Sequence, residues 1–290
     1  VKANIEFEYE ISADWITFAQ TRAMTTHELI FHVNPNDVTE PREGKITFTS
    51  GDIKEEVTIA QAGKEVSYEE VYAKEKAILA TLFEATGGSG WTDNTNWCSD
   101  LPVSQWYGIM TDLDGFVIGI SLQSNNLTGS IPEGLSGLER LISLDLSYNN
   151  LTGSIPAEIG SISNLYLIYL NFNQFSGSIP SELSNLRNLE YLELSKNQLT
   201  GNIPSELRDL QKLYRLSLFD NRLSGTIPAE LGELSNLEEL YLYNNELTGS
   251  IPAELASLSK LKICVLWGNK LSGRVPQAIM DHPCWATNWH

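Results

Sequence analysis

The sequence predicts an α/β solenoid over most of the chain, preceded by a small all-β segment. Three residue types recur in steps of 24 residues along the 290-residue chain. The asparagines of this period are Asn125, Asn149, Asn173, Asn197, Asn221, Asn245 and Asn269. Prolines keep the same step from Pro132 to Pro276, and glycines keep it from Gly129 to Gly273. A fixed period of this length is typical of a solenoid, and it favours an extended binding surface over a buried catalytic pocket.

Composition and charge narrow the possible functions. The formal net charge is −18, so nucleic acid is not an expected partner, because phosphate binding needs a basic surface. The apolar fraction of 42% suits a globular protein, and no apolar run is long enough to span a bilayer. The chain opens with VKANIEFEYE, which carries neither a signal peptide nor a lipidation motif.

The cysteines and acidic residues predict no metal site, and no cofactor is expected. The spacing of Cys98, Cys264 and Cys284 matches neither a disulfide framework nor a zinc site. Cys264 falls on a core position of the last repeat, which predicts a buried thiol; a bridge between Cys264 and Cys284 stays open. The run from Asp112 to Gly115 lacks the further ligands of a calcium loop, so it predicts a turn.

Residues 1–64 contain no 24-residue repeat and predict strands at 5–11, 27–33, 44–50 and 55–63, separated by turns. Trp15 is predicted to be a core aromatic. The elements ADWIT and NPNDVTEPREGKITFTSGDIKEEVTIAQAG resemble the later part of a BACON domain, a small immunoglobulin-like β-sandwich of Bacteroidetes surface and secreted proteins. The resemblance implies an extracellular or cell-surface location and further strands before Val1. Carbohydrate or mucin binding has been proposed for that family, but we expect a spacer here.

Residues 65–116 predict a cap for the open end of the solenoid. Ser67 and Glu70 form a capping box, which predicts the start of a helix, and glycines 87–88 predict its end. The helix has an apolar stripe of Val71, Ile78, Leu79, Leu82 and Phe83. Three tryptophans follow, and Asp114-Gly115 predicts a hairpin turn. The tryptophans of this cap are Trp91, Trp97 and Trp106. At the other end, Trp285 and Trp289 are expected to cover the last coil.

Residues 117–290 predict the seven coils of the solenoid and its C-terminal cap. The LxxLxL part of each repeat alternates, so it predicts a short strand with Leu144 and Leu146 inward and Ser143, Asp145 and Ser147 outward. Strands of successive coils stack about 4.8 Å apart in a parallel sheet. The asparagine amides are expected to bond backbone groups of their own coil and the next, and the xxLxxLxx part is expected to return as a short helical or 3₁₀ segment.

The repeats resemble those of a known family. LTGSIPAEIG, LTGNIPSELR and LSGTIPAELG resemble the plant-type leucine-rich repeat, over residues 117–280. The resemblance implies a curved right-handed superhelix with a parallel sheet on its concave face and a second short strand near LTGSIP. It also implies recognition of proteins, peptides or glycans. TGGSGWTDNTNW and WYGI resemble the N-terminal cap of this family, although its flanking cysteine pair is missing.

The outward positions of the predicted strands line up in columns. The ridge column is Gln123, Ser147, Asn171, Ser195, Phe219, Tyr243 and Trp267. The strand column is Ser121, Asp145, Tyr169, Glu193, Ser217, Tyr241 and Val265. The edge column is Leu167, Tyr191, Arg215, Glu239 and Ile263, and the turn column holds Tyr148 and Phe172. Packing of a solenoid does not require large aromatic residues at these positions, whereas binding hot spots are enriched in Tyr, Trp and Arg.

These columns predict a non-enzymatic recognition module that binds a protein or peptide on the concave face and acts as a monomer. The predicted partner-binding residues are Tyr148, Tyr169, Phe172, Tyr191, Arg215, Phe219, Tyr241, Tyr243 and Trp267. The alternative is a glycan-binding protein that uses the aromatic ridge or the N-terminal segment. The aromatic residues could also serve only as cross-strand pairs. No catalytic motif occurs, and no histidine falls on the repeat sheet, so we expect no enzyme.

Overall fold

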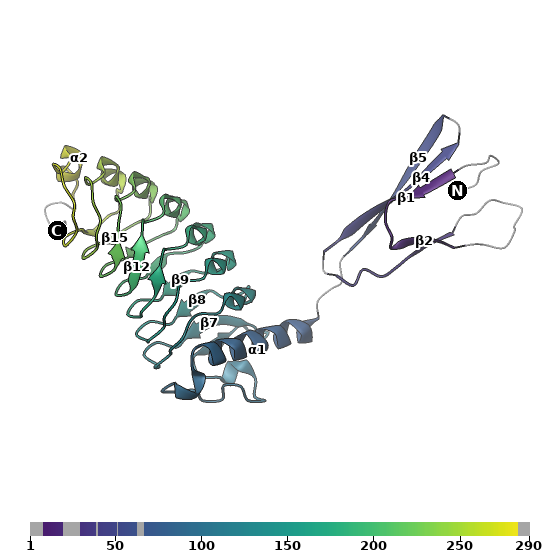
Figure 1. Ribbon diagram of the computed structural model, residues 1–290, viewed down its shortest axis with the longest axis horizontal. Helices are drawn as coiled ribbons and strands as arrows, with labels where there is room; N and C mark the ends of the chain where they lie inside the picture. Colours follow the sequence, from purple (N-terminus) through teal and green to yellow (C-terminus); the bar gives the residue numbers. More distant parts are fainter. Residues whose placement is uncertain (1–7, 20–29, 39, 51, 63–66, 284–290) are drawn as a thin grey trace, which may run out of the picture. The chain divides into compact units, whose positions relative to one another are not determined.

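The computed structural model describes residues 8–19, 30–38, 40–50, 52–62 and 67–283 (Figure 1). The chain forms two compact units, Val1–Val71 and Tyr72–His290. The cap predicted around Trp285 and Trp289 and one partner of the possible Cys264–Cys284 bridge lie outside the described residues.

The first unit is all-β, as predicted. Its strands are β1 Glu8–Ile11, β2 Ile16–Ala19, β3 Ile30–Val33, β4 Arg42–Ser50 and β5 Ile53–Gln61. Strand β4 pairs antiparallel with both β1 and β5, and β2 pairs antiparallel with β3. Strand β2 was not predicted, because its short ITFA run follows Trp15 with no turn signal between them.

Trp15 is half-buried, so the prediction of a core aromatic was wrong. The guanidinium carbon of Arg42 lies 4.3 Å from the centroid of the Trp15 ring, where a cation is attracted by the ring face. The next residue, Ile16, is 2% exposed and takes the inward position. Neighbouring residues of an extended segment point to opposite faces, so Trp15 is left at the rim.

Helix α1, Tyr68–Ala85, begins at the predicted capping box, and its residues from Tyr72 onward belong to the second unit. The backbone N–H of Ser67 donates to Glu70 Oε2 at 2.9 Å, and the N–H of Glu70 donates to Ser67 Oγ at 3.2 Å. The helix buries Leu79 and Leu82 completely against the first coils. It is followed by Gly87, whose φ of 69° is the left-handed conformation that glycine adopts readily.

The three tryptophans predicted for the N-terminal cap pack into the core of the second unit. Trp91, Trp97 and Trp106 are all buried, with 4.8 Å between the first two ring centroids and 5.2 Å between the last two. Each indole N–H donates to a backbone carbonyl: Trp91 to Thr86, Trp97 to Tyr107 and Trp106 to Leu101. A short 3₁₀ turn directly precedes two of these tryptophans: η1 Gly88–Gly90 precedes Trp91, and η2 Val103–Gln105 precedes Trp106.

The predicted hairpin closes the cap. It joins β6 Ile109–Thr111 to β7 Val117–Ser121, the first strand of the repeat sheet. Asp112 Oδ1 accepts the backbone N–H of Asp114 at 3.0 Å and that of Phe116 at 2.9 Å. Asp112 therefore supports the turn, in agreement with the sequence prediction.

The repeats build one parallel sheet, with strand order β16-β15-β13-β11-β9-β8-β7 and antiparallel β6 at its end. The further strands are β8 Ser143–Asp145, β9 Leu167–Tyr169, β11 Tyr191–Glu193, β13 Arg215–Ser217, β15 Glu239–Tyr241 and β16 Ile263–Val265. Each residue lies opposite its equivalent 24 positions on, as Tyr191 lies opposite Arg215 and Arg215 opposite Glu239. The predicted columns are therefore real neighbours across the sheet.

Each coil returns through a 3₁₀ turn that follows the repeat proline (Figure 1). The turns are η3 Glu133–Gly137, η4 Ala157–Ser161, η5 Ser181–Asn185, η6 Ser205–Asp209, η7 Ala229–Glu233 and η8 Ala253–Ser257, and the last coil ends in helix α2 Gln277–Met280. The second strand implied by the family resemblance occurs in the middle repeats. It consists of β10 Ser176–Gly177, β12 Gln198–Gly201 and β14 Arg222–Leu223, which pair in parallel.

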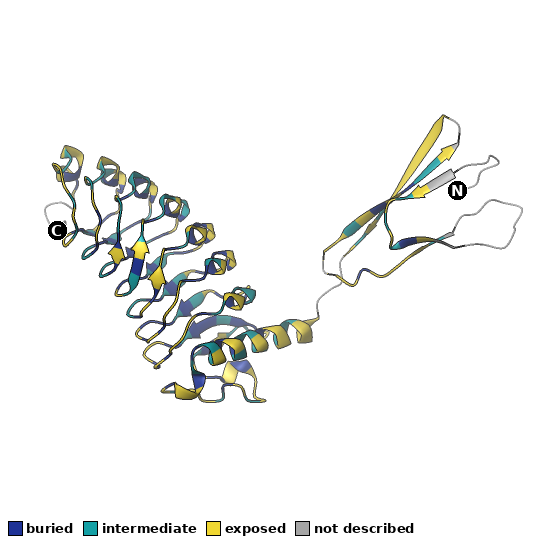
Figure 2. Cartoon of the chain, viewed as in Figure 1, coloured by how far each residue is buried: buried dark blue, intermediate teal, exposed yellow. Residues whose placement is uncertain are grey.

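The core is a continuous column of aliphatic side chains inside the coils. The buried residues are coloured dark blue on the cartoon in Figure 2. The two residues that replace a repeat leucine, Phe175 and Cys264, are both fully buried there. One coil alone buries too little apolar surface to offset its loss of chain entropy, so the core depends on stacking.

The predicted asparagine ladder is present, with one correction. Asn173 Nδ2 donates to the carbonyls of Leu170, in its own coil, and Leu146, in the preceding coil, at 3.2 and 2.9 Å. Its Oδ1 accepts the N–H of Leu151, also in the preceding coil, at 3.0 Å. The inter-coil bonds therefore go to the preceding coil and not to the next one. Where a coil leaves the sheet, its backbone N–H and C=O groups lack sheet partners. The asparagine of the following coil supplies hydrogen bonds to these groups.

Candidate binding face on the repeat sheet

The aromatic residues at the C-terminal end of the ridge column form a continuous stack, here called the aromatic ridge: Phe219, Tyr243 and Trp267. The ring centroids of Phe219 and Tyr243 are 4.4 Å apart with an angle of 7° between the planes. Tyr243 and Trp267 are 4.7 Å apart at 23°. Trp267 is 50% exposed, and the other two rings are half-buried. The rings project from the sheet rather than into the aliphatic core.

A second stack lies in the turn column near the other end of the sheet. The centroids of Tyr148 and Phe172 are 4.2 Å apart with an interplanar angle of 12°. Both residues have positive φ, 56° and 55°. This conformation is unfavourable for a bulky side chain and suits Gly or Asn, which stand at the equivalent positions 268 and 244. Two aromatic residues are therefore kept where the backbone disfavours them.

The turn column continues from these rings as a polar chain. Lys196 Nζ lies 5.9 Å from the centroid of the Phe172 ring and forms an ion pair with Asp220. Asp220 Oδ1 in turn accepts a hydrogen bond from Asn244 Nδ2 at 2.6 Å. Lys196 is thus held by Asp220 beside the second stack.

A charged cluster lies in the middle of the sheet. Arg215 Nε is 2.7 Å from Glu239 Oε2, and Arg215 Nη1 is 3.3 Å from Glu193 Oε1. Burial raises the pKa of Glu193 above its ordinary value, although Ser217 and Arg215 oppose this effect. The hydroxyl of Tyr241 donates to Glu239 Oε2 at 3.0 Å. Burial, followed by this hydrogen bond, raises the pKa of Tyr241 to about 12.

The edge-column residue Tyr191 is the centre of a tyrosine cluster. Its ring centroid is 5.5 Å from that of Tyr166, 5.4 Å from Tyr214 and 6.5 Å from Tyr169. Tyr166 and Tyr214 were missed from the sequence, although they keep the 24-residue relation to Ile142 and Glu190 at the residue before each strand. Tyr166 is 37% exposed, so this cluster extends the aromatic surface beyond the predicted columns.

The sheet face also holds a hollow, here called the concave pocket, with a volume of about 350 Å³. It is lined by Gln123, Asp145, Ser147, Tyr148, Tyr169, Asn171, Phe172, Glu193, Ser195, Arg215 and Phe219. Small ridge-column residues make room for it, and Phe219, the first ring of the aromatic ridge, also lines it. Five predicted site residues line this pocket, and Tyr243 and Trp267 extend the ridge from it. Tyr191 and Tyr241 do not line it, but their rings contact those of Tyr169 and Phe219.

Three serines predicted to point outward are almost inaccessible, which corrects part of the expectation. Ser147 is 3% exposed, and Ser195 and Ser217 are 1% exposed. They stand beside much larger side chains in the same and neighbouring columns, so short side chains at these positions are covered. The accessible part of the face is consequently made by the larger side chains.

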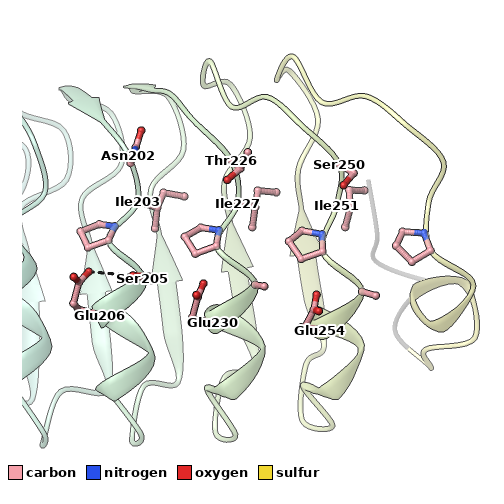
Figure 3. A pocket seen from close by; sticks show the side chains of 16 residues that line it. Asn202, Ile203, Ser205, Glu206, Thr226, Ile227, Glu230, Ser250, Ile251 and Glu254 are labelled. Atoms are coloured by element: carbon pink, nitrogen blue, oxygen red, sulfur yellow. Dashed lines mark hydrogen bonds between the residues drawn. The ribbon is translucent and has the colours of Figure 1, made fainter.

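A larger groove of about 880 Å³ lies elsewhere, between the repeat prolines and the 3₁₀ turns (Figure 3). Figure 3 shows equivalent residues of three coils side by side, with Ile203, Ile227 and Ile251 in one row. A second row is Glu206, Glu230 and Glu254. The groove repeats the consensus of each coil, and it contains none of the predicted site residues.

The described part of the chain holds no group of three or more His, Cys, Asp or Glu side chains placed to bind a metal ion. Within the same residues, no helix combines the length and the apolar composition needed to cross a bilayer.

The comparisons with known proteins identify the repeats. A model described as a leucine-rich repeat region matches residues 135–282, and a leucine-rich repeat model matches residues 118–138. The chain belongs to the leucine-rich repeat family. The BACON model, described as a putative binding domain, N-terminal, matches residues 6–62, so the leucine-rich repeats follow a BACON domain. No curated protein matches the chain.

Solved structures of plant leucine-rich repeat receptors have a similar fold. The plant peptide hormone receptor RGFR1 in complex with RGF2 is 40% identical, with a TM-score of 0.55, over 55% of this chain and 26% of the receptor chain. The Arabidopsis receptor kinase HAESA ectodomain in complex with an IDA peptide hormone is 32% identical, with a TM-score of 0.57, over 72% of this chain and 39% of that one. Pollen Receptor Kinase 3 is 30% identical, with a TM-score of 0.58, over 63% of this chain and 89% of the kinase chain. The leucine-rich repeat chain thus spans a minor part of the two peptide-hormone receptors.

Proposed function

We propose that this leucine-rich repeat protein is a non-enzymatic recognition module that binds an extended segment of a protein or peptide along the concave face of its sheet. The observation that carries the proposal is the aromatic ridge, in which Phe219, Tyr243 and Trp267 stack across three successive coils and end in a half-exposed ring. Large amphipathic rings in register supply contact area at little entropic cost.

The stacking geometry favours a peptide over a glycan. Sugar rings stack on open aromatic faces, but Tyr243 lies between Phe219 and Trp267 and has both faces covered. It offers its edge and hydroxyl to a ligand. A ridge of ring edges and hydroxyl groups suits the apolar side chains and amide groups of an extended chain better than a row of sugar rings.

The similar structures support the same class of ligand. RGFR1 and HAESA are described in complex with peptide hormones, and each shares at least 32% identity with this chain over the aligned part. We extend the proposal to location and organisation: the protein acts as a monomer outside the cell or at its surface. In this proposal, residues 1–64 are a spacer domain, residues 65–116 the N-terminal cap, and residues 117–290 the repeats with their C-terminal cap.

The test uses a random linear peptide library displayed on phage and panned on the full chain. A variant with Phe219→Ala, Tyr243→Ala and Trp267→Ala is expected to lose the enriched peptides while its circular dichroism is unchanged. The matched control replaces three exposed residues in and just before the cap hairpin, Tyr107, Met110 and Leu113, with alanine.

The control is expected to bind the peptides as the unmodified chain does. Undiminished binding by the ridge variant would exclude the ridge as the site. Failure to enrich any peptide, together with binding on a glycan array that free sugar competes away, would replace the proposal with the glycan alternative.

A further inference from the structure

The concave pocket has a floor of short polar side chains, with a carboxylate beside it and aromatic rings as its walls. Its floor is made of short side chains, Ser147, Asn171 and Ser195, at three successive positions of the ridge column. Beside them, Asp145 Oδ1 accepts hydrogen bonds from the Ser147 backbone N–H at 3.0 Å and from Ser147 Oγ at 2.6 Å. These bonds fix the orientation of the Asp145 carboxylate beside the floor of the concave pocket.

The charges of the pocket do not balance. Asp145 has no ion pair with a cationic side chain among the residues that the structure describes. The guanidinium of Arg215 is shared between Glu193 and Glu239, whose side chains are each only 13% exposed. Three carboxylates and one guanidinium leave a negative potential at the pocket, and it is stronger than at an open surface because the groups are partly desolvated.

The walls suit a cation as well as an aliphatic chain. Tyr148 and Phe172 are stacked on one side, and Tyr169 and Phe219 line the pocket from other strands. A cation is attracted to the faces of such rings, and the ammonium of Lys196 already stands 5.9 Å from the Phe172 centroid. Tyr148 and Phe172 lie at the pocket although their positive φ is locally unfavourable for bulky side chains, and such strain is often found at functional sites.

We propose that the concave pocket receives one lysine or arginine side chain of the bound peptide. The cationic group pairs with Asp145, and the aliphatic stem lies between the rings. The volume of about 350 Å³ lies at the small end of the range of about 300–1,000 Å³ for ligand pockets, which suits a single side chain. This inference rests on the proposed peptide-binding function and specifies the ligand residue that the face selects. An anionic residue would meet the unpaired Asp145, because Arg215 is already engaged.

The probes are small amides, so that the pocket is tested apart from the ridge. N-acetyl-lysine methylamide and N-acetyl-arginine methylamide carry the cation, and N-acetyl-norleucine methylamide carries the same kind of stem without it. Binding to the isotope-labelled full chain is followed by nuclear magnetic resonance titration. Both cationic amides are expected to shift the signals of Asp145, Ser147 and Tyr148, and the neutral amide is expected to shift them much less.

The decisive variant is Asp145→Asn, which keeps an oxygen for the Ser147 hydrogen bonds but removes the charge. It is expected to weaken binding of the cationic amides by about tenfold or more, the scale of one lost charge-assisted contact. The control is Glu158→Gln, an exposed acidic residue of η4 away from the pocket, which removes the same net charge. Equal binding by Asp145→Asn, equal binding of the neutral amide, or no shift at the pocket would overturn the inference.

A double variant separates this inference from the proposed function. Tyr243→Ala with Trp267→Ala shortens the ridge but leaves every residue that lines the concave pocket in place. It is expected to lose library peptides and to keep the cationic amides. If the library peptides bind but contain no excess of lysine or arginine, the pocket inference is wrong while the peptide-binding proposal stands.

Discussion

Arg215 Nε lies 2.7 Å from Glu239 Oε2, on the neighbouring strand, and the same guanidinium reaches Glu193 on the strand at its other side. One cation therefore neutralises two carboxylates that are largely withdrawn from water. The register sets Arg215 of β13 directly opposite Glu239 of β15, whereas Glu193 of β11 lies opposite Ser217, so Arg215 reaches it diagonally.

Replacement of Arg215 by glutamine is expected to destabilise the repeats. It leaves Glu193 and Glu239 without a countercharge, and breaking a buried pair from one side costs about 3–5 kcal/mol. Because the Arg215 side chain is 35% exposed, solvent screening reduces this, and we expect a loss of about 1–3 kcal/mol. Urea unfolding followed by tryptophan fluorescence measures it. Arg222→Gln, on an exposed residue of β14, is the control, and an equal effect of the two changes would contradict this account.

Most of the fold and of the candidate site that the sequence predicts follows from the 24-residue period. Once Asn125 and its equivalents define the coils, the columns follow, and so do the neighbours of Phe219 and Arg215. The period does not specify side-chain rotamers, so the face-to-face contact of Phe219 with Tyr243 and the sharing of Arg215 between Glu193 and Glu239 required coordinates. The concave pocket was missed for the same reason, because its hollow depends on how the larger side chains lean over the short ones.

Asn173→Ala is expected to lower the unfolding free energy by about 1–3 kcal/mol. The change leaves the N–H of Leu151 without its partner, and an unsatisfied buried group costs about 1–3 kcal/mol. The carbonyls of Leu146 and Leu170 keep hydrogen bonds from Asn149 and Asn197. Gln174→Ala, on the exposed next residue, is the matched control and is expected to stay within about 0.5 kcal/mol. Similar urea midpoints for the two variants would refute the role of the ladder.

Contacts between distant segments were the least predictable. Glu75 lies on α1, four residues before Leu79 on the apolar face, and is only 2% exposed, although a carboxylate is rarely buried unless it is paired. Its Oε2 accepts the backbone N–H of Val117 at 2.8 Å, which joins the cap helix to the first sheet strand. No motif in the sequence marks this pairing, because it depends on how α1 docks on the coils.

Glu75 is expected to make stability depend on pH. Burial raises its pKa above the usual 4.5 in the folded protein, so the folded state binds the proton more tightly than the unfolded state. Its contribution to the unfolding free energy is therefore greatest below pH 4.5 and decreases as the pH rises through the raised pKa.

Glu75→Gln keeps an oxygen that can accept the Val117 N–H and does not titrate. Relative to the unmodified chain, this variant is expected to become more stable between acidic and neutral pH, because it has no proton to lose. Unfolding curves at several pH values measure the difference, with the exposed Glu84→Gln of the same helix as the control. A gain by the unmodified chain over Glu75→Gln as the pH rises would show that the charge itself stabilises the fold.

A double-mutant cycle on Phe219 and Tyr243 separates a packing role of the aromatic ridge from a binding role. Their stacked rings are half-buried, so each single change to alanine is expected to cost about 1–2 kcal/mol, with a coupling of about 0.5–1.5 kcal/mol from the ring contact. Urea unfolding of the two single variants and the double variant gives these values. Losses of about 3–5 kcal/mol for each single change are typical of fully buried aromatic residues. Losses of that size would mean that the rings serve mainly as cross-strand packing, and the loss of peptide binding in the ridge variant could then no longer be assigned to direct contact.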